Sequence, residues 1–397
     1  MTTEYKSEFY LHLQPHGALL VDKKSMYYFR LSGEAVEIAL ILAKNQSLEK
    51  TARILSTVKE RKITEDDLIY MLDAHPITKV WKDEIPKLTL TGSTETYIPI
   101  SCTLQLTNGC NLFCSFCYSS SGKRLESELK ANDWITVMQN LATRGITDIT
   151  LTGGEARLIK GFKQVLTTAS SLFTNVHLFS NGLHWNPVEL DLISDLSNVY
   201  VQISIDGSSD IHDHLRGKTG AFRESMETVK QLANRNVPTL IAMTVNPTNY
   251  KSIEEVIDSS VSAGANIFRA GITLPVGRGE NVSFGLTKDE YAYVQNALNK
   301  SVEKHGDVIH IPIWDGDDSG GCSEFSTPGY LQWYIRADGL VTPCQVESVS
   351  LGHIQRNTME ELGDPSNVLS LHENVSTCRC MSKVDMPEEV DCPHTYV

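Results

Sequence analysis

The sequence predicts an α/β protein whose central part is a parallel sheet built from six strand–helix repeats. Two observations frame this prediction: two strands and three short helices precede the repeats, and the C-terminal residues lose the repeat and hold five cysteines. Strand–helix repeats imply parallel strands with right-handed crossovers. Six repeats are too few to close an eight-stranded barrel, so we expect a partial (β/α)6 barrel. We place the three domains at residues 1–98, 99–310 and 311–397.

The composition of the 397-residue chain is that of an ordinary soluble protein, with 41% hydrophobic and 21% charged residues. A formal net charge of -14 argues against a nucleic-acid partner. The sequence has no long apolar run that would span a membrane, and its N-terminus does not resemble a signal peptide. We therefore expect a cytoplasmic protein, in which clustered cysteines bind metal more often than they form disulfides.

The first 98 residues predict a small domain of winged-helix shape. Strand-like runs at Ala18–Val21 and Met26–Leu31 flank a hairpin-type break at Asp22-Lys23-Lys24. Three helical patterns follow, at Glu34–Lys44, Ser47–Val58 and Ile63–Leu72. A domain that only packs against its neighbour is an alternative. DNA binding is less favoured, because this part carries about as many acidic as basic residues.

From about residue 100 onward, strand and helix patterns alternate. The predicted strands are Thr103–Leu106, Asp148–Leu151, Val176–Phe179, Tyr200–Ile205, Thr239–Val245 and Ile267–Ile272. The predicted helices are Trp134–Thr143, Gly161–Leu172, Val188–Leu196, Phe222–Ala233, Ile253–Ala263 and Lys288–Ser301. Because active sites of parallel βα architectures form at the carboxyl ends of the strands, functional motifs should lie there.

Three cysteines follow the first of these strands, in the sequence C-N-L-F-C-S-F-C-Y: Cys110, Cys114 and Cys117. Structural zinc usually shows two separate cysteine pairs, and a 4Fe–4S cluster is normally held by four thiolates. Three thiolates would leave one iron open to a small chelating molecule. Structural zinc with a distant fourth ligand and buried thiols without metal are the alternatives.

This C-x-x-x-C-x-x-C spacing after the first strand of a partial βα barrel resembles the radical S-adenosylmethionine (SAM) enzymes. The resemblance implies a 4Fe–4S cluster on the three cysteines, with SAM chelating the open iron. It also implies that an electron from the cluster cleaves SAM to a 5′-deoxyadenosyl radical, which abstracts hydrogen from the substrate. Phe116, the aromatic residue before the third cysteine, would lie near the adenine; the alternative is an aromatic side chain that packs the loop.

The ends of the following strands carry motifs similar to those of the same family. Gly153-Gly154-Glu155 resembles the G-G-E motif that contacts the SAM amino group; glycines allow close backbone approach, and a carboxylate accepts from an ammonium group. Arg216 resembles an arginine that would pair with the SAM carboxylate, with a surface salt bridge as the alternative. The resemblance implies further contacts to ribose, methionine or adenine from Ser180, Asn181, Ser204, Asp206, Thr244 and Asn246.

The C-terminal segment resembles the auxiliary-cluster domains called SPASM and twitch. Its stretch from Gly339 to Cys344 matches their G-x-x-x-x-C element. The few cysteines beyond it imply one auxiliary iron–sulfur cluster, 4Fe–4S or 2Fe–2S, in a twitch-like domain. The favoured ligands are Cys344, Cys378 and Cys380, while Cys322 and Cys392 compete for the fourth place. Reduced thiols without a cluster are the alternative.

The N-terminal segment resembles the PqqD-like peptide-recognition domain of ribosomal-peptide maturases, and the three parts together resemble the sactisynthases. This resemblance implies that the leader of a precursor peptide binds as an extra strand, by β-augmentation. It also implies removal of an α-hydrogen from an acceptor residue, methionine in the relatives, and a thioether to a precursor cysteine. An electron donor such as flavodoxin or ferredoxin would reduce the cluster. The auxiliary cluster would ligate the substrate thiolate or relay electrons.

Two other functions fit the same residues. Peptide epimerisation or a carbon–carbon cross-link would use the same radical with a different final step. Epimerisation leaves the mass of the peptide unchanged, whereas either cross-link removes two hydrogens. A non-catalytic iron–sulfur binding or sensing protein would form no deoxyadenosine from SAM.

Overall fold

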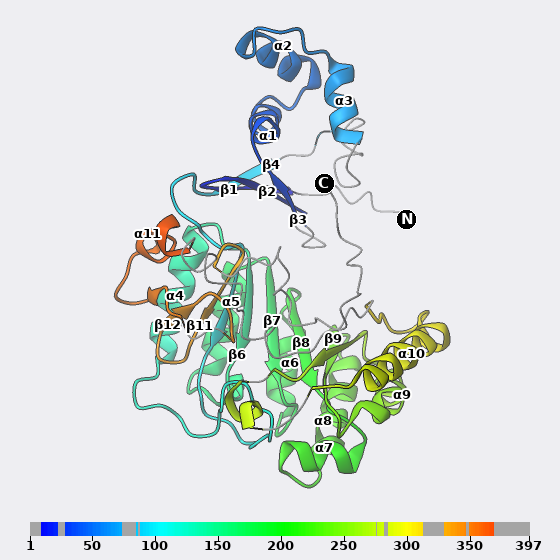
Figure 1. Ribbon diagram of the computed structural model, residues 1–397. Coiled ribbons are helices and arrows are strands. Elements are labelled where there is room, and N and C mark those ends of the chain that lie inside the picture. Colours follow the sequence, from blue (N-terminus) through cyan, green and yellow to red (C-terminus); the bar gives the residue numbers. More distant parts are fainter. Residues whose placement is uncertain are drawn as a thin grey trace. The chain divides into compact units, whose positions relative to one another are not determined.

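The computed structural model describes residues 9–22, 28–73, 85, 88–274, 276–281, 285–312, 329–346 and 349–368. Its contacts divide the described residues into two compact units (Figure 1). The first unit covers the residues up to Ile100 together with Gly363–Pro365, and the second covers Ser101–Leu362 and the residues from Ser366 on. Among the helices of these described parts, none has the length and apolar character needed to cross a membrane.

The first unit contains a four-stranded sheet in the order β3-β2-β1-β4. β1 (Phe9–Gln14) pairs antiparallel with β2 (Gly17–Asp22), and β2 pairs antiparallel with β3 (Tyr28–Leu31). The predicted hairpin is thus confirmed as β2 and β3, except for its turn, which lies outside the described residues. β4 (Leu88–Gly92) runs parallel to β1. β1 is not among the predicted strands, although Phe9, Leu11 and Leu13 alternate with the more polar Tyr10, His12 and Gln14.

Three helices follow β3 in the predicted order: α1 (Glu34–Asn45), α2 (Leu48–Val58) and α3 (Glu65–Asp73). The Ser47 side chain accepts a hydrogen bond from Lys50 N at 3.3 Å, which confirms it as the N-cap of α2. The buried core of this unit is aliphatic and includes Leu11, Leu20, Leu42, Leu55 and Leu68.

The second unit confirms the six predicted parallel strands and their sequential order. The strands are β5 (Ser101–Gln105), β6 (Asp148–Thr152), β7 (Asn175–Ser180), β8 (Val199–Ser204), β9 (Thr239–Val245) and β10 (Ile267–Ile272). The helices are α4 (Ala131–Thr143), α5 (Phe162–Leu172), α6 (Pro187–Ser194), α7 (Ser209–Arg216), α8 (Ala221–Ala233), α9 (Ile253–Ala263) and α10 (Lys288–His305). Short 3₁₀ helices cover Ala156–Leu158, Tyr250–Ser252 and Gly277–Asn281. The sequence does not predict α7, a short amphipathic helix of eight residues after β8.

Alternating side chains along the strands explain how this sheet packs. On β6, Ile149 and Leu151 are fully buried, whereas Thr150 on the other face lines a cavity. The helices cover the apolar face, and Trp134 of α4 also donates from Nε1 to Leu106 O at 3.1 Å. The apolar face is therefore the core, and the polar face is free to form a site.

The sheet continues into the C-terminal part of the chain. β11 (Gln332–Ile335) pairs parallel with β5, and β12 (Leu340–Thr342) and β13 (Gly352–His353) follow antiparallel. A short helix, α11 (Met359–Leu362), closes the described part. The sequence does not predict this extension of the sheet. The predicted ligands Cys322, Cys378, Cys380 and Cys392 lie outside the described residues.

Candidate functional site

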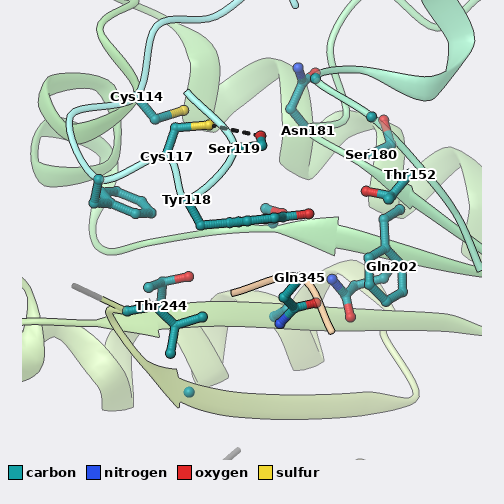
Figure 2. A pocket seen from close by; sticks show the side chains of 18 of the residues that line it. Cys114, Cys117, Tyr118, Ser119, Thr152, Ser180, Asn181, Gln202, Thr244 and Gln345 are labelled. Atoms are coloured by element: carbon teal, nitrogen blue, oxygen red, sulfur yellow. Dashed lines mark hydrogen bonds between the residues drawn. The ribbon is translucent and has the colours of Figure 1, made fainter. Parts of the chain in front are cut away.

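The three cysteines of the loop after β5 line one cavity of about 420 Å³ at the carboxyl ends of the strands. Figure 2 shows Cys114 and Cys117 beside each other at this cavity. The loop is closed at its base, because Cys110 N donates to Gly122 O at 2.9 Å and Gly122 N donates to Asn108 O at 2.9 Å. This closure turns three thiols that are separated along the chain toward the same space.

Polar groups approach each of the three sulfur atoms. Arg216 Nη1 donates to Cys114 Sγ at 3.7 Å, and Asn181 Nδ2 lies 4.0 Å from Cys110 Sγ. Cys117 Sγ and Ser119 Oγ are 3.4 Å apart, as the dashed line in Figure 2 marks. Donors aimed at sulfur stabilise thiolates, the form in which cysteine binds metal.

Two of these thiols, Cys110 and Cys114, are protonated at neutral pH in the absence of metal. Burial raises the pKa of Cys110 to about 11, and burial also raises the pKa of Cys114. Binding of iron would replace these protons. No three His, Cys, Asp or Glu residues of the described ranges are grouped as ligands of a single metal ion. A 4Fe–4S cluster does not need such a group, because each of its thiolates binds a different iron atom, and the three-cysteine loop fits it.

The two glycines after β6 let that strand end approach the three-cysteine loop. Gly154 N donates to Thr107 O at 2.7 Å. A Cβ at Gly153 would lie 2.7 Å from Thr107 O, and a Cβ at Gly154 would lie 2.5 Å from Gly109 O. Any side chain at either position would therefore push the loop away. Both glycines also line the cavity, as predicted for residues that approach a cofactor.

Glu155 is buried behind the cavity wall, with 1% of its surface exposed. Its carboxylate accepts from Ser180 Oγ at 2.9 Å and from Asn181 N at 2.9 Å. Burial raises its pKa to about 7, because the loss of hydration outweighs the opposing effects of these two hydrogen bonds and of the Arg157 charge. The structure places Glu155 against the end of β7, where it fixes Ser180 and Asn181. The contact of this motif with an ammonium group stays a prediction.

A buried ion pair follows β8. Asp206 Oδ2 accepts from Arg216 Nε at 2.5 Å and also contacts Nη2, while Oδ1 accepts from Thr244 N at 2.8 Å. The carboxylate raises the pKa of Arg216, so the guanidinium stays charged beside the Cys114 sulfur. Arg216 is thus neither a surface salt bridge nor directed at solvent. His212 Nδ1 accepts from Asp206 N at 3.0 Å and holds the turn.

The structure brings most of the predicted site residues to one cavity. The wall includes Cys110, Cys114, Phe116, Cys117, Gly153, Gly154, Ser180, Asn181, Ser204, Arg216 and Thr244. Glu155, Asp206 and Asn246 are buried outside this lining set. Phe116 packs with Leu112 and Cys114 of the loop, and the Arg216 guanidinium carbon lies 5.7 Å from the centroid of its ring.

Several residues of the cavity were not predicted from the sequence. Gln202 lies two positions before Ser204 on β8, and the period of two places both on the same face. Tyr118 directly follows the third cysteine, and its hydroxyl lies 3.4 Å from that of Tyr334 on β11. Arg269, Arg278, Gln332 and Gln345 are further polar residues of this kind. Only Gln202 and Tyr118 carried a sequence signal, since the others depend on long-range packing.

Cys344 lies just after β12, in the hairpin that extends the sheet. Its carbonyl oxygen accepts from Thr342 Oγ1 at 2.8 Å, and the residue is half-buried. Val346 packs with Cys344 and with Leu274 and Val276, which follow β10.

Comparison with known proteins identifies the class. The model of the radical SAM superfamily matches residues 104–259, the part from β5 to α9 that carries the three-cysteine loop. The fold resembles the crystal structure of Streptococcus suis SuiB bound to S-adenosylmethionine, with a TM-score of 0.68, 13% identity, and coverage of 94% of this chain and 90% of that chain. The chain belongs to the radical SAM superfamily.

Within that superfamily, the relatives are peptide-maturing proteins. The chain is 50% identical over 383 residues to the sporulation killing factor maturation protein SkfB of Bacillus subtilis, which covers 96% of this chain and 93% of that protein. It is 25% identical over 281 residues to the antilisterial bacteriocin subtilosin biosynthesis protein AlbA of the same species, covering 69% of this chain and 62% of AlbA. The predicted enzyme class, a radical SAM sactisynthase, is thereby confirmed.

Proposed function

We propose that the protein joins a cysteine sulfur of a ribosomally made precursor peptide to the α-carbon of an acceptor residue, methionine, in a sactipeptide similar to the sporulation killing factor. The observation that carries this proposal is the convergence of three thiols and four strand ends on one cavity, in a chain that is 50% identical to SkfB. The S–C bond replaces one S–H and one Cα–H bond, so the peptide loses two hydrogens.

The residues of the cavity have distinct tasks in this proposal. Cys110, Cys114 and Cys117 would hold a 4Fe–4S cluster, and SAM would bind beside it against Gly153 and Gly154. When bound, these groups supply a radical that removes a hydrogen atom from the peptide. A cavity of about 420 Å³ is within the usual range for small-molecule sites.

The far side of the cavity is suited to a peptide. Gln202, Gln332 and Gln345 line it, and Gln332 Nε2 donates to Thr103 Oγ1 at 2.8 Å. Primary amides both donate and accept, as peptide groups require. These side chains would orient the acceptor residue so that its Cα–H faces the site of hydrogen removal.

The test is anaerobic incubation of the reconstituted protein with SAM, a strong reductant and the precursor peptide. We expect deoxyadenosine, a peptide lighter by two hydrogens, and loss of its free thiol. Unchanged peptide mass would instead indicate epimerisation, loss of two hydrogens with the thiol retained would indicate a carbon–carbon link, and absence of deoxyadenosine would indicate a non-catalytic protein. Each of these outcomes contradicts the proposal.

Substitution of one cysteine tests the cluster site. Cys114→Ala should abolish deoxyadenosine formation, because one of three iron ligands is lost. The matched control is Cys102→Ala, since Cys102 is a buried free thiol on β5 outside the cavity lining. Deoxyadenosine formation by the Cys114 variant would refute the assignment of the site.

The first unit would recognise the leader of the precursor, as a PqqD-like winged-helix domain does. Its sheet has β3 and β4 at its edges, and a cavity of about 500 Å³ between α1, α2 and β4 is lined by Leu40, Ile41, Ile54, Leu88 and Leu90. An edge strand beside an apolar groove suits β-augmentation. SuiB has been crystallised bound to its precursor peptide SuiA. Leu90→Arg should weaken precursor binding by at least about tenfold and leave SAM cleavage without peptide unchanged.

We assign one auxiliary iron–sulfur cluster to the C-terminal segment, with Cys344 as a ligand. The position of Cys344 just after β12, in the stretch that matches the G-x-x-x-x-C element, supports this assignment. Cys344→Ala should lower the iron bound per chain and leave the three-cysteine site loaded. Unchanged iron content would contradict it. Such thiols must remain reduced, so we place the reaction in the cytoplasm, with a flavodoxin or ferredoxin as the electron donor.

A further inference from the structure

Arg278 contacts the three-cysteine loop from the far end of the sheet. It lies in the 3₁₀ helix that follows β10, and no motif in the sequence marks it. Its Nε donates to Cys114 O at 2.7 Å, its Nη1 donates to Ser121 O at 2.7 Å, and its backbone N donates to Cys117 O at 3.0 Å. One residue therefore satisfies three carbonyl groups, and two of them belong to predicted iron ligands.

The same guanidinium also packs on an aromatic side chain of the loop. The Arg278 guanidinium carbon lies 3.9 Å from the centroid of the Phe113 ring. Phe113 is 67% exposed, whereas its neighbours Leu112 and Phe116 in the loop are buried. A cation–π contact thus holds the part of the loop that has no apolar core beneath it.

The backbone before Arg278 is fitted closely to the loop. Gly277 has a φ of 60°, and a Cβ there would lie 2.2 Å from Tyr118 O and 2.5 Å from Cys117 O. Only glycine permits this approach. The contact of the segment with the loop is therefore built into its main chain as well as into the Arg278 side chain.

The other end of this segment packs near Cys344. Val276 and Leu274 pack with Val346 and Cys344. Leu274 also lines the main cavity. Leu274 and residues 276–278 thus contact the three-cysteine loop, the cavity and the surroundings of Cys344.

We propose that Arg278 is a positioning residue that locks the three-cysteine loop in its iron-binding shape from the end of β10. Its role differs from that of Arg216, which contacts the Cys114 sulfur, because Arg278 contacts main-chain carbonyls and leaves the thiols free. The lock adds contacts from the end of β10 to a loop that is also closed at its base and held by Ser115 N, which donates to Leu215 O at 3.1 Å. This proposed role of Arg278 rests on the three-cysteine site and does not depend on the reaction with the peptide.

The test measures how fast the reconstituted full-length protein releases iron to a chelator. Arg278→Met should accelerate release from the three-cysteine site by at least about tenfold, because two charge-assisted hydrogen bonds and the cation–π contact are lost. Arg278→Lys keeps the positive charge but carries one ammonium group in place of the guanidinium fork. Its iron release should therefore be slower than that of Arg278→Met. The electron paramagnetic resonance spectrum of the reduced protein should broaden in the methionine variant, as the loop samples several shapes.

Arg235→Met is the matched control. Arg235 Nε donates to Asp191 Oδ1 at 2.8 Å, and its Nη1 donates to Gln231 O at 3.1 Å. The Arg235→Met variant therefore also loses two hydrogen bonds of an arginine, but at a position beyond the end of α8. Release that is unchanged in Arg278→Met, or equally fast in Arg235→Met, would overturn the proposal. These outcomes do not depend on thioether formation, so they are distinguishable from a failure of the proposed function.

Gly277→Ala supplies a second variant should the arginine variant fold poorly. It retains the Arg278 side chain and displaces the backbone from Cys117 O and Tyr118 O. Iron release should again rise by at least about tenfold. Hydrogen–deuterium exchange of residues 110–122 should rise in this variant, and exchange equal to that of the unmodified protein would overturn the lock.

Discussion

Two carboxylates at the ends of β6 and β8 have the same burial and different partners. Glu155 is 1% exposed and Asp206 is 0% exposed, and each accepts from a backbone N–H of the next strand end, Asn181 or Thr244. Asp206 also pairs with Arg216, whereas Glu155 has only neutral donors at hydrogen-bond distance. One strand end therefore carries an ion pair beside the iron ligands, and the other carries a carboxyl whose pKa burial raises to about 7.

The comparison predicts its largest effect for Asp206→Asn. This change leaves the Arg216 guanidinium buried without a counter-charge, which should lower the free energy of unfolding by about 3–5 kcal/mol. Urea unfolding of the metal-free protein measures this change in the free energy of unfolding. Adding Arg216→Met to Asp206→Asn should recover part of the loss, since no charge then remains buried. A loss below about 1 kcal/mol in the single variant would show that the pair is not desolvated.

A smaller effect is expected for Glu155→Gln at about pH 6, where the native carboxyl is largely protonated. The glutamine amide can accept from only one of the two donors, Ser180 Oγ and Asn181 N, and its own NH₂ then faces the other donor. We expect a loss of about 1–2 kcal/mol by the same unfolding measurement. A loss as large as that of Asp206→Asn would mean that Glu155 is ionised and paired.

The smallest effect is a difference in pH dependence. The folded pKa of Glu155, about 7, exceeds the ordinary glutamate pKa of 4.5, so its contribution to stability is lost as pH rises between these values. Burial, with the nearby Arg216, lowers the pKa of His212 to about 3 from 6.5, so stability is lost as pH falls through this window. Each slope is at most about 1.4 kcal/mol per pH unit.

The two groups therefore oppose each other between about pH 5 and about pH 6.5. In Glu155→Gln, unfolding free energies should rise more steeply with pH than in the unmodified protein. In His212→Gln, they should rise less steeply or fall. Parallel curves for all three proteins would show that neither group titrates differently on folding.

The sequence predicts the strands and the strand-end motifs because both depend on local patterns. Six apolar strands, the cysteine spacing and the Gly153-Gly154 pair are readable within a few residues of one another. The Arg216–Asp206 pair is less readable, since the unpredicted helix α7 brings the two residues together. Arg278 and Gln332 carry no signal, because their partners in the cavity region lie 164 and 229 positions away in the sequence. Prediction failed where distant segments supply one side chain each.

The pairing of β11 with β5 has a consequence for the integrity of the chain. β11 covers the side of β5 that faces away from β6, so the strand leading into the three-cysteine loop is internal to the sheet. A protein truncated before Gln332 would expose a row of unsatisfied main-chain donors and acceptors along β5. Such a fragment is a template for intermolecular pairing, and it should accumulate as insoluble aggregates even though all six βα units are still encoded.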